Sequence, residues 1–565
     1  MAIKKDSLIK GTIILTLAAF VARFLGVVQR IPLKHLLDDT GMATYAIAYN
    51  IYFALLIVAT AGFPSALSKL ISERYAIGEY AQAARIFRAA VWFALTAGFV
   101  STVLLYAAAP YYALRISEDP DAVLAIRALA PALLLFPLIA IMRGYFQGRQ
   151  MMTANGMSQI VEQILRVLTA VGLALLLLLL GYGHVRAVAG ASFGGVMGSI
   201  GAFAVMFLYW RKLRKEDERE GKLAPSAKHA DGSAVPASLA TAEPSGPAAS
   251  HQGMGMRQIY WTILKISIPI SLISLAVPLI NFIDSSTVIP LLKQQLGDEG
   301  AKAALGILAG RAQSLAGIPI ILAIALSQSV VPVISSAFAR GDLREVGAKA
   351  SQALRISVLS GLPVVLALVA GARPVNGLLF ADTNGTGIIA MLTAASMFQI
   401  LMMTSAAIMM GLGQMRAPTV HVFAGIALKL AGSFALAPYW GIYGILAATT
   451  ASFMLTMLLN LAVLRRTVDY VVLGRRWTGM LLAAAVMLLA GFGLDRIGEQ
   501  YLHPSVSAVN FLLQSALVGI PVLLSYPLLL MLFKVVTEED FSSMPAIVRK
   551  WMLRLGIRLR SKVER

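Results

Sequence analysis

Charged side chains that lie deep inside apolar segments are the residues of this chain best placed to do chemistry. Four of them have no charge partner within their own segment: Arg23, Asp284, Arg311 and Lys429. Ionisable groups are costly in hydrocarbon, so those that are retained there are the first functional candidates. A guanidinium binds phosphate bidentately, whereas an isolated aspartate suits cation coupling or a counter-charge to an arginine. These residue types favour binding of an anion between helices.

Two further charged features have both a functional and a structural interpretation. Arg30 is seven residues after Arg23, which places both on one helix face, although Arg30 could instead extend to the outer membrane interface. Glu162 and Arg166 are four residues apart and therefore close enough to form an ion pair. Such a pair either fixes helix packing or takes part in coupling and gating.

The composition predicts an all-α polytopic membrane protein. Of the 565 residues, 58% are hydrophobic and 13% are charged, and the mean hydropathy is +0.76. Soluble domains contain about 25% charged residues. Apolar runs of about 20 residues predict about fourteen spans. The expected spans are residues 8–28, 42–66, 87–110, 122–142, 157–181, 187–210, 258–290, 305–336, 352–371, 387–411, 417–438, 441–464, 478–495 and 507–533.

The net charge of +20 is explained by membrane topology, and no nucleic-acid partner is required. Basic residues concentrate in alternate connections, which include Arg143 and Arg149, and acidic residues in the others. The positive-inside rule then places both termini in the cytoplasm. The basic segment 536–565 is expected to form an amphipathic helix on the anionic inner leaflet, with a solvated basic tail as the alternative.

Catalytic and metal-binding motifs are missing from the sequence. The chain has no cysteine, which excludes disulfides, thiolate metal sites and a cysteine nucleophile, and its six histidines are scattered without ligand spacing. It also lacks the Gly-Lys-Ser/Thr of a nucleotide-binding P-loop. We therefore expect a transporter that is not an enzyme and has no cofactor. Its energy would come from an ion gradient, the membrane potential or the gradient of its substrate.

One hydrophilic stretch divides the chain into two parts. It is rich in Ala, Ser, Gly and Pro and cannot form a core, so it is typical of a flexible linker. The expected organisation is an N-lobe at 1–212, a cytoplasmic linker at 213–256, a C-lobe at 257–466, two additional helices at 467–535 and the basic tail at 536–565.

The two lobes resemble each other in sequence. The matched positions, each separated by 263 residues, include Ile71 and Ile334, Gly148 and Gly411, and Arg166 and Lys429. Each short match alone could arise by chance, but two distant blocks share the offset. Six helices separate the copies, so both lobes have the same orientation across the membrane. Parallel repeats of this kind place the substrate path between the lobes and alternate access by rocking.

Several motifs resemble a known family. The segment Arg23-Phe24-Leu25-Gly26 is similar to the opening motif of the MurJ-type lipid II flippases, which belong to the multidrug/oligosaccharidyl-lipid/polysaccharide (MOP) superfamily. The blocks 144–148 (Gly-Tyr-Phe-Gln-Gly) and 159–167 resemble the Gram-positive branch, which includes the relatives of stage V sporulation protein B. The resemblance implies a V-shaped pair of lobes around a cationic central cavity. It also implies that the last two helices form a groove for a lipid tail.

The resemblance assigns three substrate-binding arginines. Arg23 matches the first essential arginine of the family. The next family arginine falls at Gln29, so Arg30 is displaced by one position. Arg311 matches the arginine of the eighth helix, although the aspartate that usually precedes it is Gly310 here.

The resemblance also bears on coupling. Some relatives bind sodium through side chains of the seventh, eleventh and twelfth helices. Asp284 supplies the first, but the eleventh helix offers Lys429 and the twelfth has no acid, which argues against a sodium site. Lys429 would then replace the ion by a tethered charge. We expect Asp284, Lys429, Glu162 and Arg166 to act in coupling or gating.

The function that these observations favour is translocation of lipid II, an undecaprenyl-pyrophosphate-linked peptidoglycan precursor, from the inner to the outer leaflet of a bacterial cell membrane. The expected partners are this anionic substrate, membrane lipids and the cell-wall machinery, with the protein itself monomeric. Alternatives are a flippase for a teichoic acid or capsule precursor, a MATE-like drug/cation antiporter, which would favour acids and aromatics in its cavity, and a scaffold that transports nothing.

Overall fold

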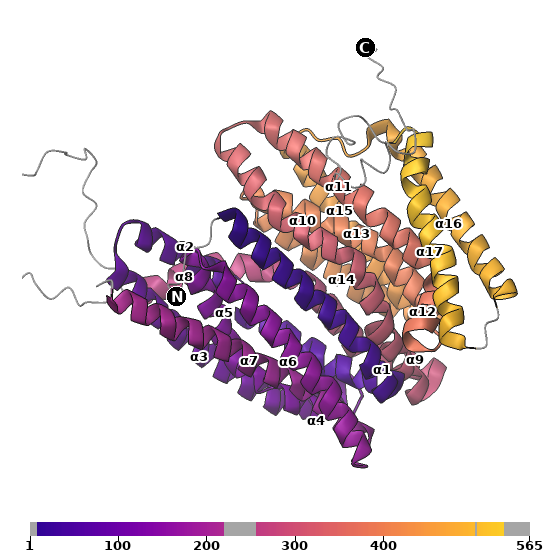
Figure 1. Cartoon of the computed structure of the whole chain (residues 1–565), viewed down its shortest axis with the longest axis horizontal. Helices are drawn as coiled ribbons and strands as arrows, with labels where there is room; N and C mark the ends of the chain where they lie inside the picture. Colours follow the sequence, from indigo (N-terminus) through magenta and orange to yellow (C-terminus); the bar gives the residue numbers. More distant parts are fainter. Residues whose placement is uncertain (1–7, 61, 220–255, 503–505, 536–565) are drawn as a thin grey trace, which may run out of the picture. The chain divides into compact units, whose positions relative to one another are not determined.

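The computed structural model describes residues 8–60, 62–219, 256–502 and 506–535 (Figure 1). The described residues are 91% helical and contain no strand, so the expected all-α class is confirmed. A helix satisfies its own backbone hydrogen bonds, which is required of a segment that crosses hydrocarbon. The expected basic tail at 536–565 and most of the expected linker lie outside the described residues.

Seventeen α-helices and three short helical turns follow one another along the described chain. In the first half they are α1 (Leu8–Thr60), α2 (Phe63–Ala76), α3 (Tyr80–Tyr111), η1 (Tyr112–Ile116), α4 (Ala122–Leu129), α5 (Ala132–Gly148), α6 (Met152–Leu179) and α7 (His184–Arg219). In the second half they are α8 (Met256–Ser274), α9 (Ala276–Gly306), η2 (Ile307–Ala312), α10 (Gln313–Ala339), α11 (Leu343–Ala370), α12 (Ala372–Phe380), α13 (Thr386–Gly411), α14 (Arg416–Trp440), α15 (Ile442–Thr467), η3 (Gly474–Arg476), α16 (Trp477–Tyr501) and α17 (Ser507–Leu532).

Twelve helical segments among the described residues are long and apolar enough to cross a membrane. Two of them, Leu17–Ala76 with 60 residues and Ala276–Ile321 with 46, exceed the length of one crossing about twofold or more. Each is interrupted by a residue in the left-handed region, Asp38 at φ 55° in α1 and Gly297 at φ 72° in α9. These breaks fall between the first and second and between the seventh and eighth expected spans. The twelve segments therefore have room for the expected crossings.

Helix α7 extends beyond its expected span. It continues to Arg219, so the expected start of the linker at 213 is too early. The last two turns are rich in Lys, Arg and Glu, which are good helix formers, and Arg214 pairs with Glu218 at 3.0 Å. The expected start of the linker is the start of the hydrophilic stretch. A helix that leaves the membrane loses its apolar pattern but keeps its helical propensity, so the stretch begins inside α7.

The chain forms two compact units that do not divide simply at the linker. Unit 1 comprises 1–26, 48–115 and 120–278, and unit 2 comprises 27–47, 116–119 and 279–565. Unit 2 therefore includes part of α1 and a short segment after α3. Unit 1 includes α8, which packs against α2: a Cβ at Gly62 would lie 2.5 Å from the carbonyl oxygen of Ser267.

The two units repeat the same helix packing. Contacts of α2 with α5, α3 with α5 and α6 with α7 in unit 1 correspond to α10 with α13, α11 with α13 and α14 with α15 in unit 2. A Cβ at Gly148 would lie 3.0 Å from the Cβ of Ile71. The equivalent contact occurs 263 residues later, where a Cβ at Gly411 would lie 2.8 Å from the Cβ of Ile334. The same close approach of helices thus supports the repeat that the sequence predicts.

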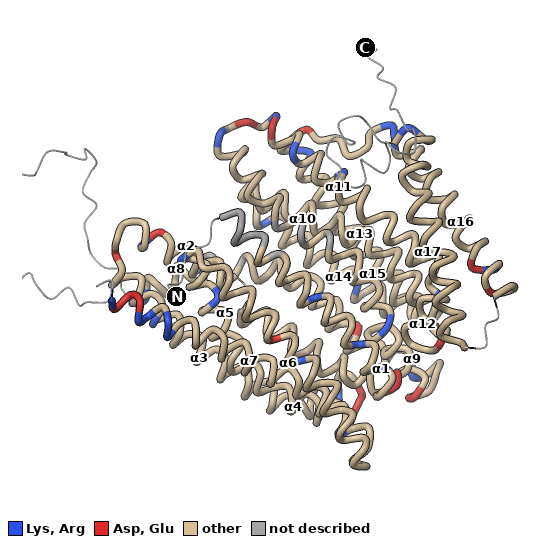
Figure 2. The backbone as a smooth tube through the Cα atoms, in the orientation of Figure 1, with Lys and Arg blue, Asp and Glu red and all other residues tan. Residues whose placement is uncertain are grey.

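The helix surfaces suit lipid. Large apolar side chains such as Leu179, Leu489 and Leu532 are more than two-thirds exposed, at 76%, 73% and 71%. Acidic and basic residues lie mainly near helix ends and connections (Figure 2). The few charged residues within the helices are therefore the exceptions that need an explanation.

Candidate functional site: three charged clusters within the helices

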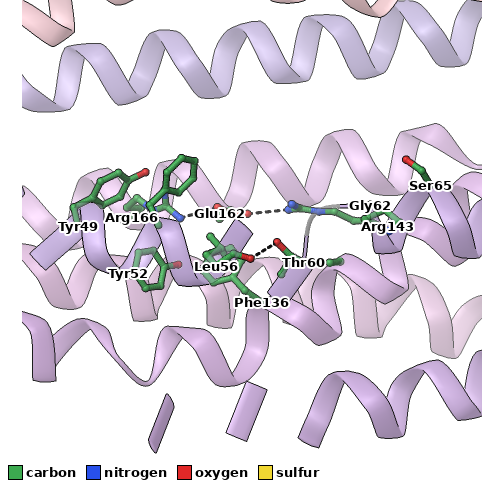
Figure 3. Close-up of a pocket in the computed structure, with 13 residues that line it drawn as sticks. Tyr49, Tyr52, Leu56, Thr60, Gly62, Ser65, Phe136, Arg143, Glu162 and Arg166 are labelled. Carbon is green, nitrogen blue, oxygen red and sulfur yellow. Dashed lines mark hydrogen bonds and ion pairs between the residues drawn. The ribbon is translucent and has the colours of Figure 1, made fainter. Parts of the chain in front are cut away.

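A cavity of about 380 Å³ lies within unit 1 (Figure 3). Its walls come from α1, α2, α5 and α6. The lining combines aromatic and charged side chains, among them Tyr49, Tyr52, Phe136, Arg143, Glu162 and Arg166. Its volume is in the range of cavities that hold a small molecule or a ligand headgroup.

One carboxylate holds two arginines in this cavity (Figure 3). Arg143 Nη2 donates to Glu162 Oε2 at 2.9 Å, and Arg166 Nη2 donates to Glu162 Oε1 at 2.8 Å. Arg143 Nη2 also donates to the buried Oγ of Ser158 at 2.8 Å. The three charged side chains are 12–19% exposed, and their formal charges sum to one positive. The cluster therefore carries an excess of positive charge toward a cavity.

The sequence predicted the pair of Glu162 and Arg166 but missed Arg143, which was grouped with the basic residues of a connection. A signal was available, because Phe136, Ala140 and Arg143 have the spacing of one helix face and all line the cavity. Arg143 lies directly after the expected span 122–142, which groups it by sequence with the basic residues that set the membrane orientation.

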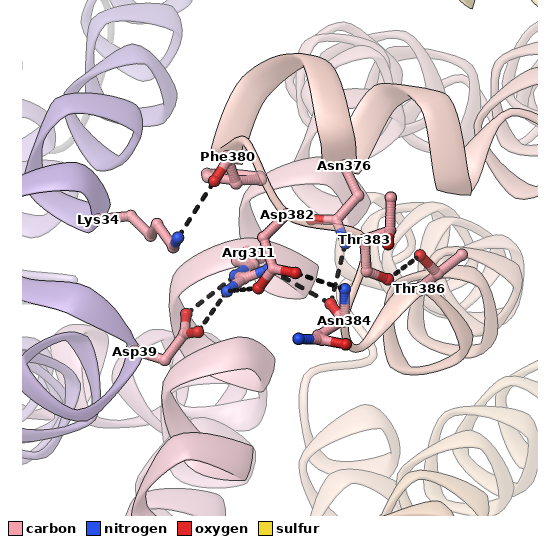
Figure 4. A network of polar contacts seen from close by, with 9 residues as sticks. All are labelled: Lys34, Asp39, Arg311, Asn376, Phe380, Asp382, Thr383, Asn384 and Thr386. Atoms are coloured by element: carbon pink, nitrogen blue, oxygen red, sulfur yellow. Dashed lines mark hydrogen bonds and ion pairs between the residues drawn. The ribbon is translucent and has the colours of Figure 1, made fainter. Parts of the chain in front are cut away.

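A second cluster, in unit 2, surrounds Arg311 (Figure 4). Its guanidinium is fully buried and contacts two carboxylates. Nε donates to Asp39 Oδ1 at 2.9 Å, Nη2 donates to the other oxygen of Asp39, and Nη2 also donates to Asp382 Oδ2 at 2.8 Å. The carbonyl oxygen of Asn384 accepts from Nη1 at 3.3 Å. In place of the family aspartate at position 310, residues distant in sequence neutralise this arginine.

Backbone geometry positions this second cluster. Arg311 lies in the π-helical turn η2, and such turns are frequent at functional sites. A Cβ at Gly306 would lie 1.7 Å from the carbonyl oxygen of Asp39, so only glycine allows α9 to approach α1 here. Burial raises the pKa of Asp382, but the backbone N–H of Asn384 and the guanidinium of Arg311 outweigh it, and the pKa lies below its ordinary value.

Further ion pairs join the same parts of unit 2. Lys302 Nζ donates to Asp119 Oδ1 at 2.7 Å, and Thr44 Oγ1 donates to Asp119 Oδ2 at 2.6 Å. Lys293 pairs with Glu118. Acidic residues of 27–47 and 116–119, which belong to the first half of the sequence, thus bind basic residues of the second half.

A third cluster joins the two predicted coupling residues of unit 2. Lys429 Nζ on α14 lies 2.6 Å from Asp284 Oδ1 on α9, and the side chains are 0% and 6% exposed. Nζ also donates to Thr449 Oγ1 at 2.7 Å and to the carbonyl oxygen of Ile445 at 3.1 Å, both on α15. Thr449 and Ile445 were not predicted, because neither residue type stands out in an apolar helix.

The three expected substrate-binding arginines do not form one cluster in a single unit. Arg23 belongs to unit 1, where it is exposed and makes no ion pair with the described residues. Arg30 belongs to unit 2 and donates to the carbonyl oxygen of Ala309 at 2.6 Å, close to Arg311 in sequence. Within the described ranges, no group of three or more acidic or histidine side chains could hold a metal ion.

Two repeated bundles of apolar helices with charged clusters inside the spans define a multi-pass membrane protein. Comparison with known families agrees: the model for "Polysaccharide biosynthesis protein" matches residues 8–229, and the model for "Lipid II flippase MurJ" matches residues 255–515. The chain therefore resembles the polysaccharide biosynthesis proteins over its first half and the lipid II flippases over its second half. The proteins that it resembles are flippases and transporters rather than enzymes.

Curated relatives cover nearly the whole chain. The lipid II flippase MurJ of Bacillus subtilis (strain 168) is 27% identical over 86% of this chain and 88% of its own length. Stage V sporulation protein B of the same organism is 24% identical over 96% and 99%. A solved structure of lipid II flippase MurJ in the inward closed conformation has a TM-score of 0.63 at 13% identity, over 92% of this chain and 99% of that one. The solved structure and this chain therefore have similar folds.

Proposed function

We propose that the protein flips lipid II from the inner to the outer leaflet of a bacterial cell membrane by alternating access. The match to the MurJ family over residues 255–515 and the relative that spans 86% of the chain support this substrate. Both termini would lie in the cytoplasm, as the distribution of basic residues favours. The protein would act as a monomer among membrane lipids and in contact with the cell-wall machinery.

The charge of the unit 1 cavity is the observation that carries the proposal. Its charged lining consists of two arginines and one glutamate. A drug/cation antiporter would need an excess of carboxylates there, because a cation must be stabilised in a medium of low dielectric constant. An excess of guanidinium groups suits a diphosphate instead.

Arg311 would alternate between two sets of partners. In this structure its charge is neutralised by Asp39 and Asp382. Separation of those carboxylates would release the guanidinium, which would then bind the diphosphate together with Arg30 of the same unit. Arg23, in unit 1, would also contact the substrate. Loss of the buried ion pairs would be offset by the new contacts with the substrate. The state in which Arg311 pairs with the two aspartates and the state in which it binds the substrate would then have comparable stability.

The Lys429–Asp284 pair would bias the equilibrium of unit 2 without a bound sodium ion. Its ammonium has three oxygen partners in a fully buried position, which is the environment a monovalent cation would need. The membrane potential or the gradient of the substrate would then drive transport, with Glu162 and Arg166 as further gating residues.

A flippase for another polyprenyl-linked glycan is the second candidate. The full-length similarity to stage V sporulation protein B favours it, since that relative is covered over 99% of its length. The same cationic residues would bind the phosphate of a teichoic acid or capsule precursor, so the glycan has to be identified by experiment.

The test is complementation of a bacterial strain depleted of its own lipid II flippase, with lipid II measured separately in each leaflet. We expect the wild-type chain to restore growth and outer-leaflet lipid II, and the Arg23→Gln and Arg311→Gln variants to fail. The Arg88→Gln variant is the matched control, because Arg88 is an exposed arginine of α3 that does not line the cavity. Stable expression without restored transport would rule out lipid II. Growth supported equally by all variants would indicate a scaffold.

A further inference from the structure

The cluster of Arg143, Glu162 and Arg166 resembles an anion site that already contains an anion. The two oxygens of Glu162 accept one guanidinium each, at 2.9 Å and 2.8 Å (Figure 3). The two arginines come from different helices, α5 and α6, and approach the carboxylate from different directions. Two arginines can bind a tetrahedral oxyanion in this way. Here the carboxylate of Glu162 occupies the position that such an anion would take.

The charge balance favours exchange of that carboxylate for a more highly charged ligand. Two guanidinium groups and one carboxylate leave a net positive charge at a cavity of about 380 Å³. A diphosphate carries more negative charge and more acceptor oxygens than one carboxylate, so it would satisfy both arginines more fully. Arg143 would keep its second contact, to Ser158 Oγ at 2.8 Å, during the exchange.

The cavity also offers what the rest of a headgroup would need. Tyr49, Tyr52 and Phe136 form part of its wall. Thr60 and Ser65 bring hydroxyl groups to the same lining, and Ser65 is exposed. A site that served packing alone would be filled to the density of a protein interior and would leave no such volume.

We propose that Arg143 and Arg166 form a phosphate-binding subsite in unit 1, in which the carboxylate of Glu162 is a resident counter-ion that the ligand displaces. The ligand is a phosphate-bearing lipid headgroup, and the assignment of its diphosphate to a lipid-linked glycan rests on the proposed function. The subsite is separate from the arginines at 23, 30 and 311. Glu162 weakens binding, which allows release of the ligand after transport.

The first experiment measures binding of inorganic pyrophosphate to the full-length protein in phosphatidylcholine nanodiscs by calorimetry. We expect Glu162→Gln to bind pyrophosphate about tenfold more tightly than the wild type, since the competing carboxylate is gone. Arg143→Gln and Arg166→Gln should lose binding, and Arg88→Gln should bind as the wild type does. A purely structural triad predicts the opposite for Glu162→Gln, a loss of thermal stability with no gain in affinity, and that result would overturn the proposal.

A second measurement avoids substitutions in the cluster. The chain has no cysteine, so a single Ser65→Cys change introduces a unique thiol in the cavity lining. Pyrophosphate should slow its reaction with a thiol reagent several-fold. Ser72→Cys is the matched control, because Ser72 is exposed on the same helix but does not line the cavity. Equal labelling rates with and without pyrophosphate at both positions would contradict the proposal even if Glu162→Gln did not fold.

The source of the phosphate is identified by the lipid. If phosphatidylglycerol in the nanodiscs competes with pyrophosphate, the subsite takes a phospholipid headgroup. If it does not, and a short-chain polyprenyl diphosphate competes, the subsite takes the lipid-linked substrate. Binding is measured independently of transport. If the protein binds pyrophosphate but fails to complement, the proposed subsite is supported and the lipid II assignment is rejected. If the protein complements but pyrophosphate binding does not depend on the cavity residues, the lipid II assignment is supported and the proposed subsite is rejected.

Discussion

Arg166 and Lys429 occupy the same position of the two sequence repeats, 263 residues apart, and each is neutralised by one nearby carboxylate. The carboxylates have different origins. Glu162 is on the same helix as Arg166 and is shared with Arg143, whereas Asp284 comes from a different helix and serves Lys429 alone among the described residues. One unit therefore has an excess of positive charge beside a cavity, and the other has a balanced pair that is fully buried. The equivalent positions of the two repeats therefore differ in charge balance and in burial.

The buried pair of unit 2 predicts strongly non-additive mutations. Lys429→Met alone leaves a buried aspartate without its cation and should lower the free energy of unfolding by about 3–5 kcal/mol. Asp284→Asn should have a similar effect. The double variant should cost much less than the sum, because neither charge remains buried. Thermal unfolding of the purified proteins measures the cycle, and additive losses would show that the two side chains do not interact.

Asp382 predicts a pH dependence of stability. Its pKa is below the ordinary value in the folded protein, so the unfolded chain binds the proton more readily. The stabilisation by Arg311 is therefore fully present above the unfolded pKa of about 3.9 and is lost as the pH falls through the folded value. Asp382→Asn should flatten this part of the profile of melting temperature against pH. An unchanged acid limb in the variant would mean that other carboxylates determine it.

Gly306 predicts a steric effect that depends on position. Gly306→Ala would place a methyl group 1.7 Å from the carbonyl oxygen of Asp39, so α9 and α1 would have to separate. We expect lower thermal stability and weaker pairing of Arg311 with Asp39. Gly317→Ala is the matched control within α10, because a Cβ there meets no atom within 4 Å. Melting temperatures that fall equally for both variants would argue for a general effect of helix glycines.

Periodicity and charge predicted most of the helices, but the expected span 258–290 is two helices, α8 and α9, which meet at residue 275. Apolar runs predicted the spans because a helix that crosses lipid needs about 20 apolar residues. The shared offset of 263 residues predicted equivalent helix packing in the two repeats, and the close contacts at Gly148 and Gly411 agree with it. The start of the linker was placed too early, since Arg214 and Glu218 extend α7 by an ion pair rather than by hydrophobicity. Local pattern cannot distinguish a solvated helix end from a loop when both are polar.

The charged clusters were only partly predictable. Glu162 and Arg166 could be paired from their spacing, because both lie on one helix. The partners of Arg311 could not, since Asp39 and Asp382 are 272 and 71 residues away and are brought together by tertiary packing. Both aspartates fall between expected spans, so the sequence offered no reason to pair them with an arginine inside a span.

The contacts of Arg311 predict a conformational change that labelling can detect. Asp39→Asn removes the carboxylate that accepts from two nitrogens of Arg311, so the structure around η2 should open more often. Ser314 is 3% exposed and should be protected from thiol reagents in a Ser314→Cys protein. We expect Asp39→Asn to raise its labelling rate about tenfold with a membrane-impermeant reagent added from outside.

A matched position separates this opening from general unfolding. Ser396 is also buried in unit 2, at 1% exposure, but its helix α13 contributes no contact to Arg311 through that residue. Ser396→Cys should stay protected when Asp39→Asn is added, because only the ion pairs at η2 are broken. Labelling that increases at both positions would mean that Asp39 supports the stability of the whole unit, and labelling unchanged at Ser314→Cys would mean that Asp382 alone keeps Arg311 in place.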